Sequence, residues 1–366
     1  MPRVRCLKSL NTNNMEKKYK LTEKTINVDG SILHRIEALR DFNDVKKGDK
    51  GGFIENESNL SQNGNCWVYD DAVVYGNARV YDNAKVYDYA KVCDNAKVYG
   101  NAWVFGNAVV CDNAEVYGNA MVYDNAKVYE DARIYGNAKV YHNAAVYGNA
   151  RVYDNAKVYD YAKVCDNAKV YGNAWVFGNA RVYCNAMVYD NAVVCDNAEV
   201  YGNAVVDDNA QVYDNANVYE DAEVFGNAEI RGDAVITSKS DYIVFKNWWS
   251  SGRYFTWTRS NDMWKVGCFY GTGKELIKKA YKDSELSGRE YERVVRYVES
   301  IIITKHEIFE KLKKDKEMKY NGIIPLIYKR IVCTLWKGHN YIPVSPEDLS
   351  GKRLFECKYC KKQRVW

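Results

Sequence analysis

The chain of 366 residues lacks several features that would point directly to a function. It has no run of about 18 apolar residues, so we expect no membrane-spanning helix and no membrane partner. The N-terminus carries Arg and Lys but no apolar segment of a secretory signal, which favours a cytoplasmic protein. Only four histidines are present, and no glycine-rich phosphate loop is found. General-base and nucleotide chemistry therefore have few candidate residues.

Net charge is also small, at +4, but it is unevenly distributed. Residues 68–235 contain 13 Lys and Arg against 24 Asp and Glu, a net charge of −11, which leaves +15 for the rest. Residues 304–366 contain 15 basic and 7 acidic side chains. Such an asymmetry suits nucleic-acid binding through the basic C-terminal segment. It also suits a homo-oligomer in which the basic end of one chain contacts the acidic repeats of another, although a solvated surface explains it equally well. The 11 cysteines are scattered as in a reduced chain.

What the chain does contain is one six-residue unit, repeated 28 times without interruption from residue 68 to 235. Every first position is Val or Ile, and every fifth is Ala. The second position is Tyr or Phe in 22 units, and the fourth is Asn in 22. A strict short period with aliphatic and small residues predicts a parallel β-helix in which Val and Ala point inward and Tyr outward. We expect Asn to turn the corner in left-handed backbone geometry, with Gly at the neighbouring position in other units.

Three units make a triangular turn of 18 residues. The stretch 88–108 recurs unchanged at 160–180, an offset of 72 residues, or four such turns. The 28 units then predict slightly more than nine turns, a rod about 45 Å long at the usual strand spacing. Cys93 and Cys111 are 18 residues apart and should lie on adjacent turns, where the spacing would permit a disulfide.

The repeat resembles that of hexapeptide-repeat proteins, with Tyr or Phe where that family often has Gly. The segment Gly51-Gly52-Phe53-Ile54-Glu55 and its neighbours are similar to the entry segment of a phage and bacterial group labelled acyltransferase-like. The resemblance covers roughly residues 18–236 and implies a left-handed coil of the single-stranded parallel β-helix type. It also implies acyl transfer by a catalytic His at a cleft between subunits.

The flanking segments complete the predicted organisation. Alternating residues around the Asp29-Gly30 turn predict a β-rich cap, which an exposed β-helix end requires. Beyond the repeats we expect three strands and two helices. The predicted parts are an extension at 1–15, a β cap at 16–67, the hexapeptide-repeat β-helix at 68–237, a small α+β domain at 238–303, a charged linker at 304–319 and a zinc-binding tail at 320–366.

The tail holds the one metal-ligand pattern that we identify. Cys333 and His339 are followed by Cys357 and Cys360, a Cys-x2-Cys pair. Four nitrogen and sulfur ligands suit a structural, tetrahedral zinc, which would stabilise a segment too small to bury a core, although unliganded thiols are the alternative. The tail also resembles small phage zinc-ribbon-like proteins.

These observations favour a non-enzymatic scaffold or binding protein with an unknown protein or glycan partner. Acyl transfer is the alternative, and nucleic-acid binding through the basic tail is a second one. The uninterrupted repeats argue against acyl transfer, because the enzymes usually carry an active-site loop between coils. His142, at a corner normally held by Asp or Gly, is a weak catalytic candidate and is more simply a solvated substitution. A candidate aromatic binding surface comprises Trp103, Trp175, Trp248 and Trp249, although stacking or core packing also explains such rings.

Overall fold

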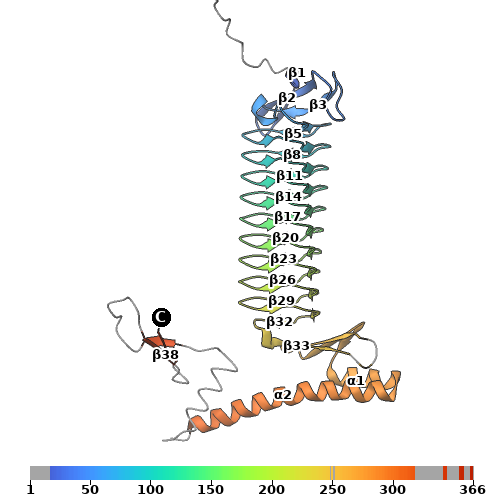
Figure 1. Ribbon diagram of the computed structural model, residues 1–366, viewed down its shortest axis with the longest axis vertical. Coiled ribbons are helices and arrows are strands. Elements are labelled where there is room, and N and C mark those ends of the chain that lie inside the picture. Colours follow the sequence, from blue (N-terminus) through green and yellow to red (C-terminus); the bar gives the residue numbers. More distant parts are fainter. Residues whose placement is uncertain are drawn as a thin grey trace, which may run out of the picture. The chain divides into compact units, whose positions relative to one another are not determined.

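The computed structural model describes residues 17–247, 249, 252–317, 341–343, 354–357 and 363–365, with side chains as far as residue 302. The chain forms two compact units that divide between Leu276 and Ile277. The first unit contains a stack of short parallel strands, a β-rich segment at its beginning and an antiparallel sheet at its end (Figure 1).

The stack has three faces, each a parallel sheet whose paired residues are 18 apart in sequence. Face 1 contains β4 (Trp67–Val68), β7 (Lys85–Val86), β10 (Trp103–Val104), β13 (Met121–Val122), β16 (Lys139–Val140), β19 (Lys157–Val158), β22 (Trp175–Val176), β25 (Val193–Val194), β28 (Gln211–Val212) and β31 (Glu229–Ile230). Face 2 contains β5 (Val73–Val74), β8 (Lys91–Val92), β11 (Val109–Val110), β14 (Lys127–Val128), β17 (Ala145–Val146), β20 (Lys163–Val164), β23 (Arg181–Val182), β26 (Glu199–Val200), β29 (Asn217–Val218) and β32 (Val235–Ile236). Face 3 contains β6 (Arg79–Val80), β9 (Lys97–Val98), β12 (Glu115–Val116), β15 (Arg133–Ile134), β18 (Arg151–Val152), β21 (Lys169–Val170), β24 (Met187–Val188), β27 (Val205–Val206) and β30 (Glu223–Val224).

The interior of this stack is the predicted one. The Val or Ile that ends each strand and the Ala that follows it across the corner are almost completely buried along the whole length. The 18-residue turn is therefore confirmed, and the coil makes about ten turns. The protein contains a parallel β-solenoid.

The expected corner geometry is wrong in one respect. The residue with left-handed backbone angles is the third of each unit, such as Asp82 (φ 57°) and Gly100 (φ 67°), and not the Asn that follows it. Asn instead forms side-chain ladders: the amide of Asn83 donates to Asn101 18 residues on, at 3.1 Å. One ladder runs unbroken from Asn65 to Asn209. Asn is thus selected by contacts between turns, which a single unit cannot reveal.

The cap begins with β1 (Tyr19–Val28) and β2 (Ser31–Ala38), an antiparallel hairpin around Asp29-Gly30 as predicted. β3 (Lys50–Ile54) pairs with β2 and also, in parallel, with β5, and a 3-10 turn, η1 (Glu57–Asn59), follows. Gly52 lies so close to the carbonyl oxygen of Ala72 that no side chain would fit, which explains a glycine there. Leu60 bridges to Val80, so the coil starts inside the segment expected to be the cap.

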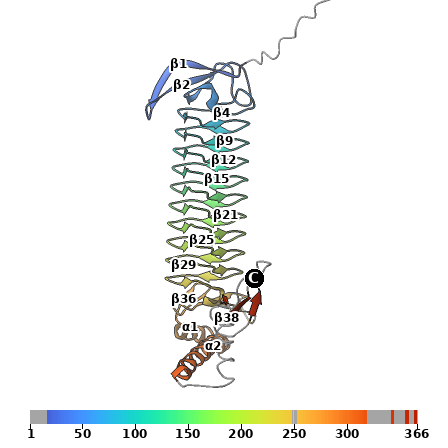
Figure 2. The ribbon, with the colours of Figure 1, turned by 90° about the vertical axis from the view of Figure 1, so that its left-hand side faces the viewer.

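The β1–β2 hairpin also extends beside the coil (Figure 2). Leu33 and Phe53 pack with Tyr75 and Cys93 of face 2 in a small hydrophobic cluster. The cap therefore covers the first rungs of one face as well as the exposed strand edges at the end of the stack.

The other end is closed by an antiparallel sheet of β33 (Tyr242–Lys246), β34 (Tyr254–Thr258), β35 (Met263–Val266) and β36 (Phe269–Gly271), entered through the 3-10 turn η2 (Lys239–Asp241). The third expected strand is split in two by a turn between β35 and β36. The backbone amide of Glu229, on the last rungs, donates to Thr256 Oγ1 at 3.0 Å, and that of Val235 donates to Ser260 Oγ at 2.7 Å. Edge donors of the coil are thereby satisfied, as a capped β-helix requires.

Helix α1 (Gly273–Asp283) crosses the boundary between the two units and has a capping box, in which the Thr272 amide donates to Glu275 Oε2 at 2.9 Å. The second unit contains α2 (Glu285–Glu317), which extends the predicted helix through most of the charged linker. It also contains an antiparallel sheet of β37 (Tyr341–Pro343), β38 (Leu354–Cys357) and β39 (Gln363–Val365). Within the described residues, no helix is long and apolar enough to cross a membrane.

Candidate ligand-binding face

Face 1 carries a continuous column of aromatic rings. Six rings from consecutive rungs stack almost parallel, with centroids 4.8–5.0 Å apart: Tyr87, Phe105, Tyr123, Tyr141, Tyr159 and Phe177. The spacing is that of neighbouring strands, because each ring follows the same inward Val and leaves the sheet in the same direction. Such stacking stabilises neighbouring rungs by about 0.5–1.5 kcal/mol per pair beyond the area buried. The column alone is therefore explained by stability.

Trp103 and Trp175 lie on the same face, as the sequence predicted, one residue before the inward Val of β10 and β22. Their exposed fractions are 37% and 38%. The Trp103 ring is turned by 68° from the ring of Tyr87, so its faces are not used in the stack. Trp175 has the same relation to Tyr159, at 72°. These two indoles are thus partly exposed and available to a ligand.

Each Trp is accompanied by a lysine from the preceding rung. Lys157 Nζ lies 4.3 Å from the ring centroid of Trp175, and Lys85 Nζ lies 5.8 Å from that of Trp103. Cation–π contact of this kind contributes about 0.5–1 kcal/mol at exposed sites and places an ammonium group beside each indole. The Lys85 ammonium also donates to Asp44 Oδ2 of the cap at 2.9 Å, so the two sets differ in this contact.

Two further aromatic residues were missed by the sequence reasoning. Tyr89 and Tyr161 take the place of the corner Asn beside face 1, and their exposed fractions are 68% and 62%. The Asn ladder of this corner is interrupted at both positions. The side-chain amide hydrogen bonds between rungs are therefore missing there, and an exposed phenol takes their place. The signal was available in the sequence, because these are the two units with an aromatic residue at the fourth position.

The two sets of residues are copies of one another. Residues 74–108 are identical to residues 146–180, an even longer repeat than the stretch noted above. Lys85, Tyr89 and Trp103 therefore recur four turns away as Lys157, Tyr161 and Trp175 on the same face. At about 4.8 Å per turn, the copies are about 19 Å apart. We name these residues and the ring column between them the aromatic face.

Burial in the column raises the pKa of Tyr87, Tyr123 and Tyr159 to about 12. Desolvation is the largest cause in each case, and neighbouring carboxylates add to it. The phenols therefore stay protonated near neutral pH, and each hydroxyl remains a neutral hydrogen-bond donor and acceptor.

The other two faces also have ring columns, but these columns are not accompanied by Trp side chains. Face 3 stacks seven tyrosines from Tyr81 to Tyr189. Face 2 has shorter stacks because cysteines stand at 93, 111 and 165. No Trp lies on either face, which sets the aromatic face apart.

His142 lies at the corner beside the aromatic face, in the left-handed position (φ 55°). Its Nδ1 is 2.9 Å from Asp160 Oδ1, and its backbone amide donates to Asp124 Oδ2 at 3.3 Å. Half of the side chain is exposed. A His held by a carboxylate is chemically able to act as a base. The same geometry also fits a solvated corner substitution. Asp124 accepts the His142 amide in the way that Asp112 and Glu130 accept the amides of the next turn at another corner.

Of the remaining candidate residues, Trp249 lies elsewhere in the fold, and the others lie wholly or in their side chains outside the described residues. Trp249 packs against Phe255 in the sheet that closes the coil, with centroids 5.9 Å apart, and Trp248 lies outside the described residues. Trp257 and Trp264 of the same sheet are buried. The zinc ligands Cys333, His339 and Cys360 lie outside the described residues, as does the side chain of Cys357, whose backbone ends β38.

Comparison with known proteins agrees with the coil. Residues 132–148 match the family model described as the YdcK β-solenoid repeat. The chain is also 41% identical over 66 residues to a protein of Escherichia coli strain K12 named as an uncharacterised acetyltransferase, YdcK. This similarity covers 16% of the chain and 20% of the relative's length.

The chain is a β-solenoid repeat protein. The similarity extends over about a fifth of the relative, so it supports the repeat and does not carry that protein's named activity to this chain.

Proposed function

We propose that this protein is a non-enzymatic binding scaffold, whose β-solenoid presents the aromatic face to a linear polysaccharide. The observation that carries the proposal is the duplicated set of Lys, exposed Tyr and Trp, placed twice on one face at a four-turn spacing. Sugar rings stack their C–H faces on indole, and the neutral phenols and lysines supply hydrogen bonds to hydroxyl or acidic groups. An extended chain can contact both copies, which strengthens binding through effective concentration.

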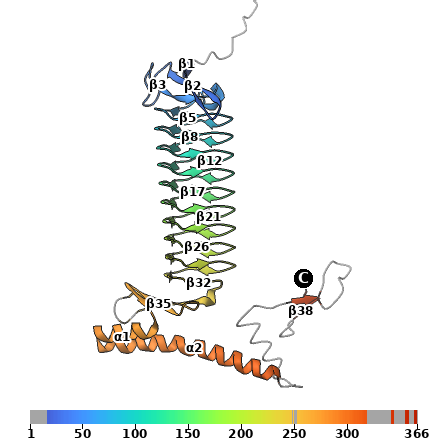
Figure 3. The ribbon, with the colours of Figure 1, turned by 180° about the vertical axis from the view of Figure 1, so that it is seen from behind.

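The rigidity of the coil suits this role. The coil continues from rung to rung without an inserted loop between residues 68 and 236, and the two copies are held in fixed register by backbone hydrogen bonds (Figure 3). A ligand that spans both copies therefore encounters a preorganised surface and loses little affinity to ordering the protein.

The test is binding of the full chain to a panel of neutral and acidic linear polysaccharides by affinity electrophoresis. Trp103→Ala and Trp175→Ala should each weaken binding by on the order of tenfold, and the double variant should abolish it, because buried Trp contacts dominate such interfaces. Met187→Ala is the matched control, since Met187 holds the same repeat position on face 3. Binding that survives in the double variant, or binding of single-stranded nucleic acid in place of every polysaccharide, would refute the proposal.

Acetyl transfer is the second candidate, favoured by the contact between His142 and Asp160 and by the name of the relative. We propose that it is absent, because the coil around His142 carries no active-site loop and the side chain lies at an open corner. The full chain should show no turnover of acetyl-CoA with or without the polysaccharide. Turnover that disappears in His142→Ala would overturn the binding-scaffold proposal.

We further propose that the coil winds left-handed and that the protein is phage- or prophage-related, on the strength of the family resemblance. The same resemblance supports action in the cytoplasm of a bacterial host. The cysteine and histidine spacing supports a structural zinc in the 320–366 tail, and its basic charge supports a second, nucleic-acid partner.

A further inference from the structure

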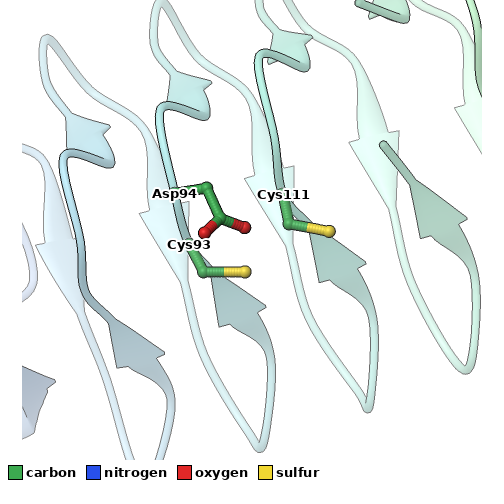
Figure 4. A group of neighbouring side chains, drawn as sticks. All are labelled: Cys93, Asp94 and Cys111. Atoms are coloured by element: carbon green, nitrogen blue, oxygen red, sulfur yellow. The ribbon is translucent and has the colours of Figure 1, made fainter. Parts of the chain in front are cut away.

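Two cysteines occupy adjacent rungs of face 2. Cys93 follows β8 and Cys111 follows β11, and these strands pair in parallel with Val92 opposite Val110. The two sulfur atoms and a carboxylate oxygen of Asp94 all lie within 4.8 Å of one another. Figure 4 shows both thiols projecting to the same side of the sheet, with the Asp94 carboxylate beside them.

The cap makes this part of the face different from the rest. Cys93 is buried, at 4% exposure, in the cluster with Leu33, Phe53 and Tyr75, whereas Cys111 remains partly exposed at the edge of that cluster. The Tyr75 hydroxyl donates to Asp29 of the hairpin at 2.7 Å. One side of the sulfur pair is thus covered by protein, and on the other side Cys111 is partly exposed to solvent. The Lys91 ammonium, which is paired with Asp29, also lies near enough to interact with both thiols.

A disulfide is a poor fit to this geometry, although the sequence spacing permits it. Neighbouring in-register strands hold equivalent Cβ atoms about 4.8 Å apart, whereas a disulfide needs about 3.8 Å. Closing that gap would displace rungs whose backbones are hydrogen-bonded on both sides, such as Cys93 N–H to Val110 O and Cys111 N–H to Val128 O. Both cysteines are free thiols in the structure.

A bridging metal ion fits the same geometry without moving the rungs. Zinc–sulfur bonds of about 2.3 Å at tetrahedral angles place two sulfurs about 3.8 Å apart, which rotation of the two side chains can supply. Asp94 already uses Oδ2 to accept the Asp112 amide at 3.3 Å, and its other oxygen is available as a third ligand. Two thiolates and one carboxylate suit zinc and its heavier analogue cadmium far better than calcium or magnesium.

The internal repeat supplies a natural comparison. Cys165 has the same sequence around it as Cys93, because 146–180 copies 74–108, but the next rung carries Tyr183 where Cys111 stands in the first copy. A second cysteine, Cys184, stands one position later on that rung, where its amide donates to Asp166. Within the described residues, only Cys93, Asp94 and Cys111 bring two thiols and a carboxylate within 4.8 Å of one another.

We propose that Cys93, Asp94 and Cys111 form a binding site for one thiophilic divalent cation, Zn²⁺ in the cell, with the fourth coordination position open to solvent. The ion ties two rungs together beside the β1–β2 hairpin. This site uses none of the residues proposed to hold zinc in the tail and none of those in the aromatic face.

The experiment is a titration of the full-length reduced chain with Cd²⁺, followed by its thiolate charge-transfer absorption and by equilibrium dialysis. Differences between variants isolate this site from the other cysteines. Cys111→Tyr should bind one cadmium fewer per chain than the wild type, and it keeps the fold because Tyr is the usual residue at that position. Cys93→Ser should lose the same ion, and Asp94→Asn should weaken it.

Cys165→Ser is the matched control and should bind as many ions as the wild type. Equal metal content in Cys111→Tyr and wild type would overturn the proposal, as would an equal loss in Cys165→Ser. A Cys93–Cys111 disulfide found by peptide mapping of the metal-loaded, unreduced protein would also overturn it, since the bridged sulfurs could not hold the ion.

Discussion

The tightness of the solenoid interior makes a sharp prediction for Ala150. This side chain is fully buried, and the residues at the same place on the neighbouring rungs are Ala132 and Ala168. The carbonyl oxygen of Ala150 accepts the Arg133 amide at 2.9 Å, so the backbone at this corner is held in the ladder. Replacement by Leu adds three carbon atoms inside the coil.

Two opposite effects decide the sign of the change. If the interior held a cavity, burying three more carbons would stabilise the protein by about 0.8 kcal/mol each. If the corner is filled, the larger side chain forces neighbours out of their rotamers and costs about 1–3 kcal/mol. Every repeat unit has Ala at this inward position, which favours the second outcome. We therefore expect Ala150→Leu to lower the free energy of unfolding by about 1–3 kcal/mol.

The measurement is the denaturant midpoint of the rod, followed by far-ultraviolet circular dichroism, with Ala145→Leu as control. Ala145→Leu is the same substitution on the neighbouring strand β17. The Ala145 side chain points outward, between Lys127 and Lys163 of the adjacent rungs. The control should change the free energy of unfolding by no more than about 0.5 kcal/mol. An unchanged or higher midpoint for Ala150→Leu, or equal loss in both variants, would refute the tight-corner argument.

Three other outcomes are expected. Tyr147→Ser removes a stacked ring 4.9 Å from Tyr129 and should cost about 0.5–1.5 kcal/mol, less than Ala150→Leu; a larger loss in the same unfolding assay would mean that the column carries more stability than the core. Hydrogen bonds from Lys91 and then Tyr75 hold the pKa of Asp29 below its ordinary value, so the hairpin should be stabilised above about pH 4 and lose that stability as pH falls through the lowered folded-state pKa. Amide exchange in the hairpin should therefore become faster at low pH. Asp29→Asn should remove that pH dependence, and an unchanged pH profile in this variant would contradict the argument. The purified 304–366 fragment should contain about one zinc, lost in Cys357→Ser, and a folded metal-free fragment would exclude the tail site.

The arrangement of the rungs was predictable because the same contacts recur at every turn. Val146 and Ala150 repeat at fixed offsets along the coil, so one pattern predicts their burial and the 18-residue register. The position of Trp103 on the surface, one residue before an inward Val, also follows from the local pattern and is confirmed.

The contacts between turns were harder to predict from single units. The left-handed residue is most often the Asp or Gly before Asn. Asn forms the ladder, and the carboxylate of a preceding Asp accepts the next turn's amide, as Asp82 Oδ2 does from Gly100 at 3.1 Å. Tyr89 reads as a departure from the repeat in the sequence, but its exposure beside the face that carries Trp103 depends on which corner the unit occupies.

The sequence by itself determined the solenoid, since a six-residue period with inward Val and Ala has one way to bury its apolar positions. Only the tertiary structure decided which face the cap covers and which side chains become neighbours across turns. Cys93 and Cys165 have identical local sequences, yet the first lies under the β1–β2 hairpin next to a second thiol and the second lies next to Tyr183. The hairpin contacts are made once, between residues far apart in the chain, such as Asp29 with Tyr75 and Lys91, which are 46 and 62 positions away, and therefore leave no periodic trace in the sequence.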